Sequence, residues 1–250
     1  MSGMKVLPLA LLLALFLIPL GLLNAAWAVI SVSNGEYLTG VIVLGLAAFC
    51  FGFIVPFIKI IPGNVAPRAV SDRDGTVIRP DPAIERPMLA AFSGLVIASG
   101  LFAIFFPINQ IDIPVPSAMR VYLPVIAAAI ALIGAPIVWR MLGLGGAYRL
   151  TLSREGFDLR SGGGRPRTGS WAHVVDVTDA VPGRTAADDP HTIVIVMSDE
   201  TVIKLPGASF TPGGDALRRF VRFYWEHPED REELADGRAL ERLAAASRRP

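Results

Sequence analysis

Residues 121–152 read VYLPVIAAAIALIGAPIVWRMLGLGGAYRLTL and change character abruptly at Gly145-Gly146. The apolar part, 121–142, carries one charge, Arg140, near its end. Its length suits a helix that crosses about 30 Å of hydrocarbon. After the glycine pair, polar and apolar residues alternate as they do in a β-strand. This stretch therefore predicts a membrane-embedded part that ends near residue 145 and a β-rich domain that follows it.

Three further apolar runs precede this one. The four predicted spans cover about residues 6–30, 37–61, 88–108 and 121–142, and none has a charge at its centre. Each run reaches the roughly 20 residues that a transmembrane helix needs. The hydrophobic share of 52% and the mean hydropathy of +0.51 agree with this interpretation. We expect residues 1–145 to form a four-helix transmembrane bundle.

Basic residues predict the orientation of this bundle. The loop 62–87 between the second and third spans carries four arginines, Arg68, Arg73, Arg79 and Arg86. The connections 31–36 and 109–118 carry no lysine or arginine. Since cytoplasmic loops are enriched in these residues, the loop 62–87 and both termini are expected in the cytoplasm. The chain is thus predicted to be a multi-pass protein of a cell membrane, namely the bacterial inner membrane.

The first run has an alternative interpretation. Lys5, the apolar stretch and Ala26-Trp27-Ala28 imitate a secretory signal peptide with its cleavage site. The stretch is longer than the roughly 7–15 apolar residues usual in such peptides, which favours a helix that is retained. Retention and cleavage both remain open at this stage.

The loop 62–87 also allows two interpretations. Its prolines and Asp74-Gly75 predict irregular structure, but Thr76–Arg79 is a short β-prone segment. This segment either adds a strand to the C-terminal domain, because an isolated strand cannot bury its apolar face alone, or belongs to a solvated loop. In the second case its arginines only set the topology and contact anionic lipid.

The residues after Gly146 predict a small β-sheet or half-barrel closed by a C-terminal helix, over 146–228. The expected strands are 148–152, 157–160, 169–177, 191–197 and 201–205. Gly156 is expected to take a positive φ in the first turn. An amphipathic helix begins near Asp215, with Thr211 or Asp215 as its cap, and ends at Pro228. The remaining residues, 229–250, are predicted to form a charged C-terminal tail with at most one short helix.

A resemblance arises from the segment Ser170-Trp171-Ala172-His173-Val174-Val175-Asp176-Val177, which follows the first hairpin. The order of hairpin, Trp-containing strand and closing helix over residues 147–226 resembles bacterial PH-like (pleckstrin-homology-like) domains. Many of these domains are fused to transmembrane helices in proteins of unknown function. The resemblance implies seven strands, more than the five that this part of the chain predicts. Either the domain is a reduced version, or Thr76–Arg79 contributes a further strand.

Few side chains stand out as candidates for function. Trp171, Phe220 and Tyr224 are predicted to be structural core residues, and His173 is expected to pack on the same face as Trp171. Three arginines around one hairpin tip are the best candidates for contact with lipid phosphates or a protein partner. These three are Arg160, Arg165 and Arg167.

Several function classes are disfavoured. From residue 148 onward there are 15 Lys and Arg against 16 Asp and Glu, whereas a nucleic-acid binder normally has a basic excess. The glycine-rich turn 161–167 lacks the Gly-Lys-Ser/Thr ending of a phosphate-binding loop. No histidine or cysteine has partners at metal-ligand spacing, and no cofactor or catalytic site is predicted. We expect a non-enzymatic scaffold or docking protein that binds the bilayer, a protein partner or anionic lipid headgroups. The alternative is an accessory subunit of a membrane transporter or other membrane complex.

Overall fold

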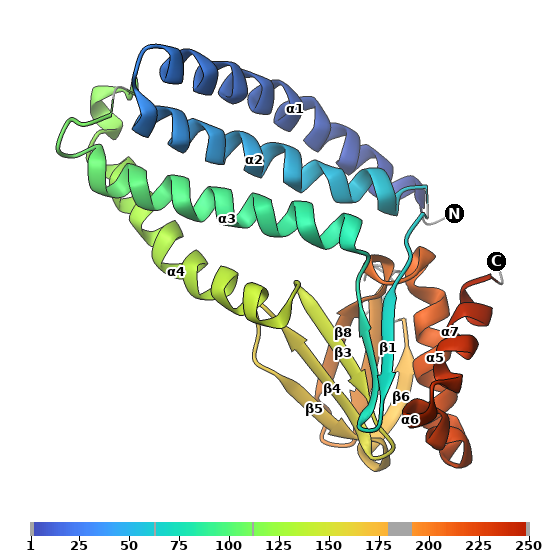
Figure 1. The fold of residues 1–250 in the computed structure, drawn as a ribbon. Coiled ribbons are helices and arrows are strands. Elements are labelled where there is room, and N and C mark those ends of the chain that lie inside the picture. Colours follow the sequence, from blue (N-terminus) through green and yellow to red (C-terminus); the bar gives the residue numbers. More distant parts are fainter. Residues whose placement is uncertain (1–2, 63, 112, 180–191, 249–250) are drawn as a thin grey trace. The chain divides into compact units, whose positions relative to one another are not determined.

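The computed structural model describes residues 3–62, 64–111, 113–179 and 192–248 (Figure 1). The chain divides into two compact units. We call the first the helical unit; it comprises Gly3–Ile58 and Glu85–Gly143. The second, the sheet unit, comprises Lys59–Ile84 and Leu144–Pro250. Each unit is described separately below.

Long helices make up the helical unit. They are α1 (Gly3–Ser33), α2 (Tyr37–Ile60), α3 (Pro82–Phe105) and α4 (Tyr122–Leu144), with a short 3-10 helix at Ser117–Met119. All four are long and apolar enough to cross a membrane, as the sequence predicts. Their exposed side chains are largely leucine, isoleucine and valine, which suits a lipid environment and not water.

Glycine allows α2 and α3 to pack closely. A Cβ added to Gly45 would lie 2.6 Å from the carbonyl oxygen of Gly94, and one added to Gly52 would collide with the carbonyl oxygen of Pro87. Small residues at such contacts let the backbones of membrane helices approach each other. The pair is therefore held by close van der Waals packing along much of its length.

Helix α3 begins six residues before the predicted third span, at Pro82. Asp81 caps it, because its Oδ1 accepts a hydrogen bond of 2.7 Å from the backbone N–H of Ala83. The other oxygen, Oδ2, accepts one of 3.1 Å from Ala66 N–H. Proline suits the first position of a helix. The hydropathy pattern missed this turn because Glu85 and Arg86 interrupt the apolar run.

Two antiparallel sheets make up the sheet unit (Figure 1). The first contains β1 (Arg68–Asp72), β2 (Gly75–Arg79), β3 (Tyr148–Leu152), β4 (Gly156–Ser161) and β5 (Arg167–Ser170), in that spatial order. The second contains β6 (Val174–Thr178), β7 (Thr192–Met197) and β8 (Val202–Pro206). His191, expected at the start of β7, lies outside the described residues. Helix α5 (Asp215–Glu226) follows, after 3-10 helices at Gly207–Ser209 and Pro212–Gly214.

The loop between the second and third apolar helices contributes two of these strands. Strand β2 pairs with β3, with Val77 opposite Thr151 and Ile78 opposite Leu150. Ile78 is fully buried, and Thr76 Oγ1 donates a hydrogen bond of 2.7 Å to the carbonyl oxygen of Leu234. The interpretation of 62–87 as a wholly solvated loop is therefore wrong, because Ile78 needs the core that only the C-terminal segment supplies.

The predicted strand 169–177 is two strands in different sheets. A 3-10 turn, Trp171–His173, separates β5 from β6, and the Ser170 hydroxyl accepts a hydrogen bond of 3.4 Å from Ala172 N–H at its start. The turn interrupts the two-residue alternation, so Trp171 is buried and His173 is exposed. The expected packing of His173 beside Trp171 is therefore wrong.

Gly156 does not adopt the positive φ expected of it. The reason for glycine is a close approach: a Cβ at this position would collide with the carbonyl oxygen of Gly169 on β5. Positive φ occurs instead at Gly75, where the β1–β2 hairpin turns, with φ 141°, and at Glu200 between β7 and β8, with φ 63°.

The core of the sheet unit lies between the two sheets and α5. Its side chains include Trp171, Phe220 and Tyr224, which are 3%, 1% and 0% exposed. Helix α5 begins at Asp215, as the sequence predicts, but its N-cap residue is Gly214, which makes no side-chain cap hydrogen bond. The hydroxyl of Thr211, which precedes the intervening 3-10 helix, accepts a hydrogen bond of 3.2 Å from Leu217 N–H in the first turn of α5.

The segment after Pro228 is part of this core and not a tail. It forms a 3-10 helix (Pro228–Glu232), α6 (Glu233–Asp236) and α7 (Arg238–Arg248). Leu234 and Leu243 are 0% and 3% exposed and join the same hydrophobic cluster as Phe220. Charged residues dominate the segment, which hides the few apolar positions that anchor it.

Candidate functional site

A basic groove lies at one end of the sheet unit, where the first sheet meets β8. Its volume is about 550 Å³. The lining residues come from β3, β4, the β4–β5 turn, β5 and β8: Tyr148, Leu159, Ser161, Gly164, Arg165, Arg167, Val202 and Lys204. Two arginines and one lysine face it, and no acidic side chain is among these residues. Its charge suits an anion.

Arg167 holds the two sheets together at this groove. It lies opposite Leu159 in the β4–β5 register and so extends on the core side of the first sheet. Its Nη1 donates a hydrogen bond of 3.0 Å to the carbonyl oxygen of Val202 on β8. Because a guanidinium has five N–H donors, this bond leaves donors for a ligand.

The three arginines predicted to act together are not one cluster. Arg165 and Arg167 line the groove, whereas Arg160 follows the buried Leu159 on β4 and extends from the opposite, outer face of the sheet. Arg160 Nε donates a hydrogen bond of 2.7 Å to Asp158 Oδ2 on the same face. The alternation of side chains along a strand causes this separation, since 160 and 159 must lie on opposite faces.

Tyr148 and Lys204 belong to the groove and were missed by the sequence analysis. Burial raises the pKa of the Tyr148 hydroxyl. This hydroxyl, like that of any tyrosine at neutral pH, can donate a hydrogen bond. Lys204 extends from β8, which belongs to the other sheet. The alternation along β8 predicts that Lys204 is exposed. Its proximity to Arg167 could not be predicted, because nothing in the sequence specifies how the two sheets meet.

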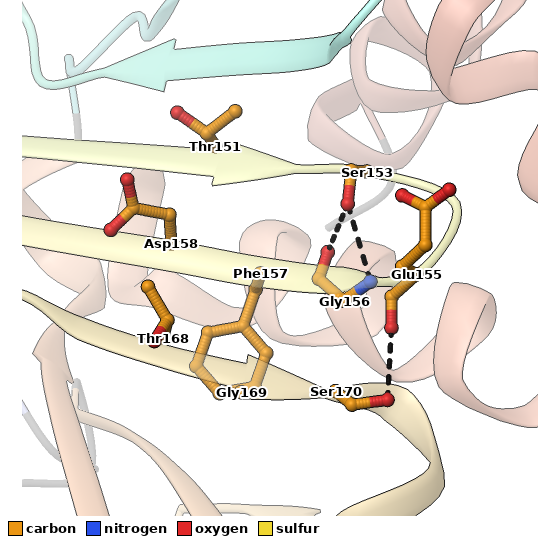
Figure 2. A pocket seen from close by; sticks show the side chains of 9 residues that line it. All are labelled: Thr151, Ser153, Glu155, Gly156, Phe157, Asp158, Thr168, Gly169 and Ser170. Carbon is orange, nitrogen blue, oxygen red and sulfur yellow. Dashed lines mark hydrogen bonds between the residues drawn. The ribbon is translucent and has the colours of Figure 1, made fainter.

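A second hollow, of about 330 Å³, lies over the other end of β3, β4 and β5 (Figure 2). Ser153 Oγ accepts a hydrogen bond of 3.2 Å from Gly156 N–H, and Ser170 Oγ donates one of 3.1 Å to the carbonyl oxygen of Glu155. These hydroxyls hold the β3–β4 turn. The polar groups of this hollow serve the local fold.

Among the described residues, no group of three or more His, Cys, Asp and Glu is arranged to hold a metal ion. Comparison of the chain with models of protein families, with curated proteins and with solved structures finds no match.

Proposed function

We propose that this chain is a non-enzymatic, multi-pass protein of the bacterial inner membrane whose sheet unit is a docking module on the cytoplasmic side. Four helices of membrane-spanning length support the multi-pass arrangement. The pairing of β2 with β3 requires the segments before α3 and after α4 to lie on one side of the membrane. The arginines of the loop 62–87 favour the cytoplasm for that side.

The strand order supports the resemblance to a PH-like domain. Strands β2–β5 and β6–β8 form consecutive groups of antiparallel neighbours, and α5 follows them. This is the order of seven strands and a closing helix that the resemblance implies. On this interpretation α3 and α4 are an insertion between the first and second strands of the domain, and β1 is an addition at the edge.

The observation that carries the docking role is the basic groove. Arg165 and Arg167 line it together with Lys204, and no carboxylate is among the lining residues. Such a groove suits acidic side chains of a protein partner, because bidentate arginine–carboxylate contacts give both affinity and orientation. Only three residues separate α4 from β3, so a partner that occupies the groove is held at the membrane surface.

Affinity capture of the crosslinked full-length protein from membranes tests this function. We expect a specific partner to be recovered with the wild type and to be lost with Arg165→Glu/Arg167→Glu. Arg154→Glu is the matched control, since Arg154 is exposed in the β3–β4 turn at the other end of the sheet. If the wild type recovers no partner and retains no anionic lipid, the docking role is wrong.

The alternative function is that of an accessory subunit of a transporter or other membrane complex. The helical unit contains a cavity of about 230 Å³, whose polar lining side chains are those of Asn24 and Ser99. Asn24 Nδ2 already donates a hydrogen bond of 2.7 Å to the carbonyl oxygen of Leu20. An apolar cavity of this kind suits a lipid tail or a neighbouring helix. The alternative would be favoured if a polytopic transporter is captured both with Arg165→Glu/Arg167→Glu and with Arg154→Glu.

A further inference from the structure

Four arginines form a row across the first sheet. Arg68 on β1 lies opposite Arg79 on β2, and Arg149 on β3 lies opposite Arg160 on β4. The register between β2 and β3 pairs Ile78 with Leu150, which brings Arg79 next to Arg149. We call these residues the arginine row. It crosses four neighbouring strands with one arginine on each.

The arginine row lies on the outer face of the sheet. Its neighbours along β2, β3 and β4 are Ile78, Leu150 and Leu159, which point into the core and are 0%, 0% and 6% exposed. Successive side chains of a strand point to opposite faces, so the arginines point away from the core. The row is thus separate from the basic groove, which opens on the core side beside β8.

Within the described part of the chain, neither of the two central arginines is paired with a carboxylate. Among the described residues, the guanidinium groups of Arg79 and Arg149 take part in no ion pair and no hydrogen bond. The carboxylate of Asp158 on the same face is engaged by Arg160. Like charges that face each other across strands are destabilising. Because Arg79 and Arg149 lie side by side with no acidic side chain between them among the described residues, we expect them to bind an anion that the chain does not supply.

The row occupies the end of the sheet from which the chain leaves for α3 and returns from α4. Arg79 precedes the first residue of α3 by three positions, and Arg149 follows the last residue of α4 by five. The Arg79 guanidinium lies beside the α4–β3 link: a Cβ on Gly145 would be 3.0 Å from its Nη1. Gly145 has φ 69°, so glycine both permits the turn and leaves room for the arginine.

We propose that the arginine row is a binding site for phosphate groups, with Arg79 and Arg149 as its central pair. A dianionic phosphate monoester has enough oxygens to accept hydrogen bonds from two guanidinium groups at once, and the planar fork of arginine matches this geometry. The phosphate belongs either to the headgroup of an anionic lipid such as phosphatidic acid or to a soluble phosphorylated molecule. We take the lipid as the expected source from the membrane position in the proposed function.

The full-length protein in phosphatidylcholine nanodiscs provides the test. Unfolding of the sheet unit is followed by heating, first in phosphatidylcholine alone, then with phosphatidic acid in the disc or with inorganic phosphate in the buffer. We expect phosphatidic acid to raise the midpoint temperature, and the increase to shrink with added salt because exposed charges are screened. An equal increase with inorganic phosphate would identify a soluble ligand for the same site.

Paired variants show whether the row is responsible. Arg79→Gln/Arg149→Gln should weaken binding of phosphatidic acid on the order of 100-fold, about tenfold for each arginine. Arg79→Lys/Arg149→Lys keeps the charge and should lose part of the affinity, since lysine lacks the bidentate fork. Arg73→Gln is the control: Arg73 is exposed in the β1–β2 turn at the other end of the sheet.

Two results would overturn the phosphate site. One is an absence of any midpoint increase in the wild type with either probe, and the other is a full increase in the double glutamine variant. Without phosphate that variant should be at least as stable as the wild type, because the facing positive charges are gone. If the double glutamine variant fails to fold, the midpoint increase of the single variant Arg149→Gln is compared with that of the wild type instead. Partner capture is tested with Arg165→Glu/Arg167→Glu and the phosphate site with Arg79→Gln/Arg149→Gln, so a failure of the phosphate site leaves the recovery of a partner unchanged, and a failure to recover a partner leaves the midpoint increase unchanged.

Discussion

Replacing Arg242 by alanine should destabilise the sheet unit, because this arginine neutralises a nearly buried carboxylate. Arg242 Nε and Nη2 donate hydrogen bonds of 2.8 Å and 2.9 Å to the two carboxylate oxygens of Glu233. Glu233 also accepts a bond of 3.1 Å from the hydroxyl of the fully buried Tyr224. The guanidinium lies 3.9 Å from the ring centroid of Phe223. This group of contacts joins α5, α6 and α7.

The magnitude follows from these contacts and from their exposure. A hydrogen bond to a charged group contributes about 1.5–3 kcal/mol when buried. The side chains of Arg242 and Glu233 are 36% and 11% exposed, so solvent screens the arginine more than the carboxylate. The variant leaves Glu233 with one neutral donor, and we expect a loss of about 2–3 kcal/mol in the free energy of unfolding. For a domain of this size the midpoint temperature should fall on the order of 10 °C.

The same contacts predict a dependence on pH. The hydrogen bonds from Arg242, followed by the one from Tyr224, lower the pKa of Glu233. A carboxylate with a lowered folded-state pKa stabilises the fold above its unfolded-state value of about 4.3, and this stabilisation is lost as pH falls through the folded-state pKa. The difference in stability between wild type and Arg242→Ala should therefore be full at neutral pH and shrink below about pH 4.

Thermal unfolding of the full-length protein in detergent, followed by near-ultraviolet circular dichroism, measures this difference. The control is Arg222→Ala, which removes an exposed arginine whose Nε bonds Glu226 at 2.8 Å on the surface of α5. An exposed pair of this kind should leave the midpoint almost unchanged. Equal shifts for the two variants, or a loss that stays constant from neutral to acid pH, would show that Arg242 acts only through packing.

Two further variants test how the sheet unit is assembled. Ile78→Asp should prevent folding of the sheet unit, because it places a charge at a fully buried position. The measurement is the loss of cooperative unfolding. Val70→Asp on the neighbouring strand should be tolerated, because the side chain of Val70 is 65% exposed. Gly156→Ala should lower the midpoint temperature by disrupting the β4–β5 pairing, since its Cβ would collide with the carbonyl oxygen of Gly169. Gly163→Ala should leave the midpoint temperature unchanged, because its Cβ would have open space. Cooperative unfolding of Ile78→Asp, or equal midpoints for the two glycine variants, would contradict these expectations.

Hydropathy and alternation predicted the elements that depend on local pattern. Strand β3 has the predicted limits, Tyr148–Leu152, and the apolar helices lie close to the predicted spans. Each of these signals is contained in one continuous segment, and so a sequence pattern is enough to detect it. The start of α5 at Asp215 was predictable for the same reason, because the amphipathic pattern of the helix begins there.

The misses depended on contacts between distant segments. Gly156 is glycine because of Gly169 across a strand pair, and Lys204 faces Arg167 only because the two sheets meet there. The arginine row has the same origin, since Arg79 and Arg149 are brought together by a register that the sequence does not state. The prediction that Arg160, Arg165 and Arg167 act together illustrates the opposite case. These residues are close in sequence, but Arg160 lies on the other face of the sheet from the groove.

The split origin of the first sheet imposes a delay during synthesis. The β1–β2 hairpin leaves the ribosome before α3 and α4, and Leu152, at the end of its partner strand β3, follows Arg79 by 73 residues. At about 5–20 residues per second, the hairpin waits about 4–15 s for β3. A lone two-stranded hairpin is at best marginally stable in water, so Ile78 remains exposed until β3 has been synthesised. In the membrane arrangement proposed above, completion of the sheet acts as a check on insertion. A chain in which α3 or α4 fails to cross leaves the two halves of the sheet on opposite sides of the membrane and the hairpin open to proteolysis.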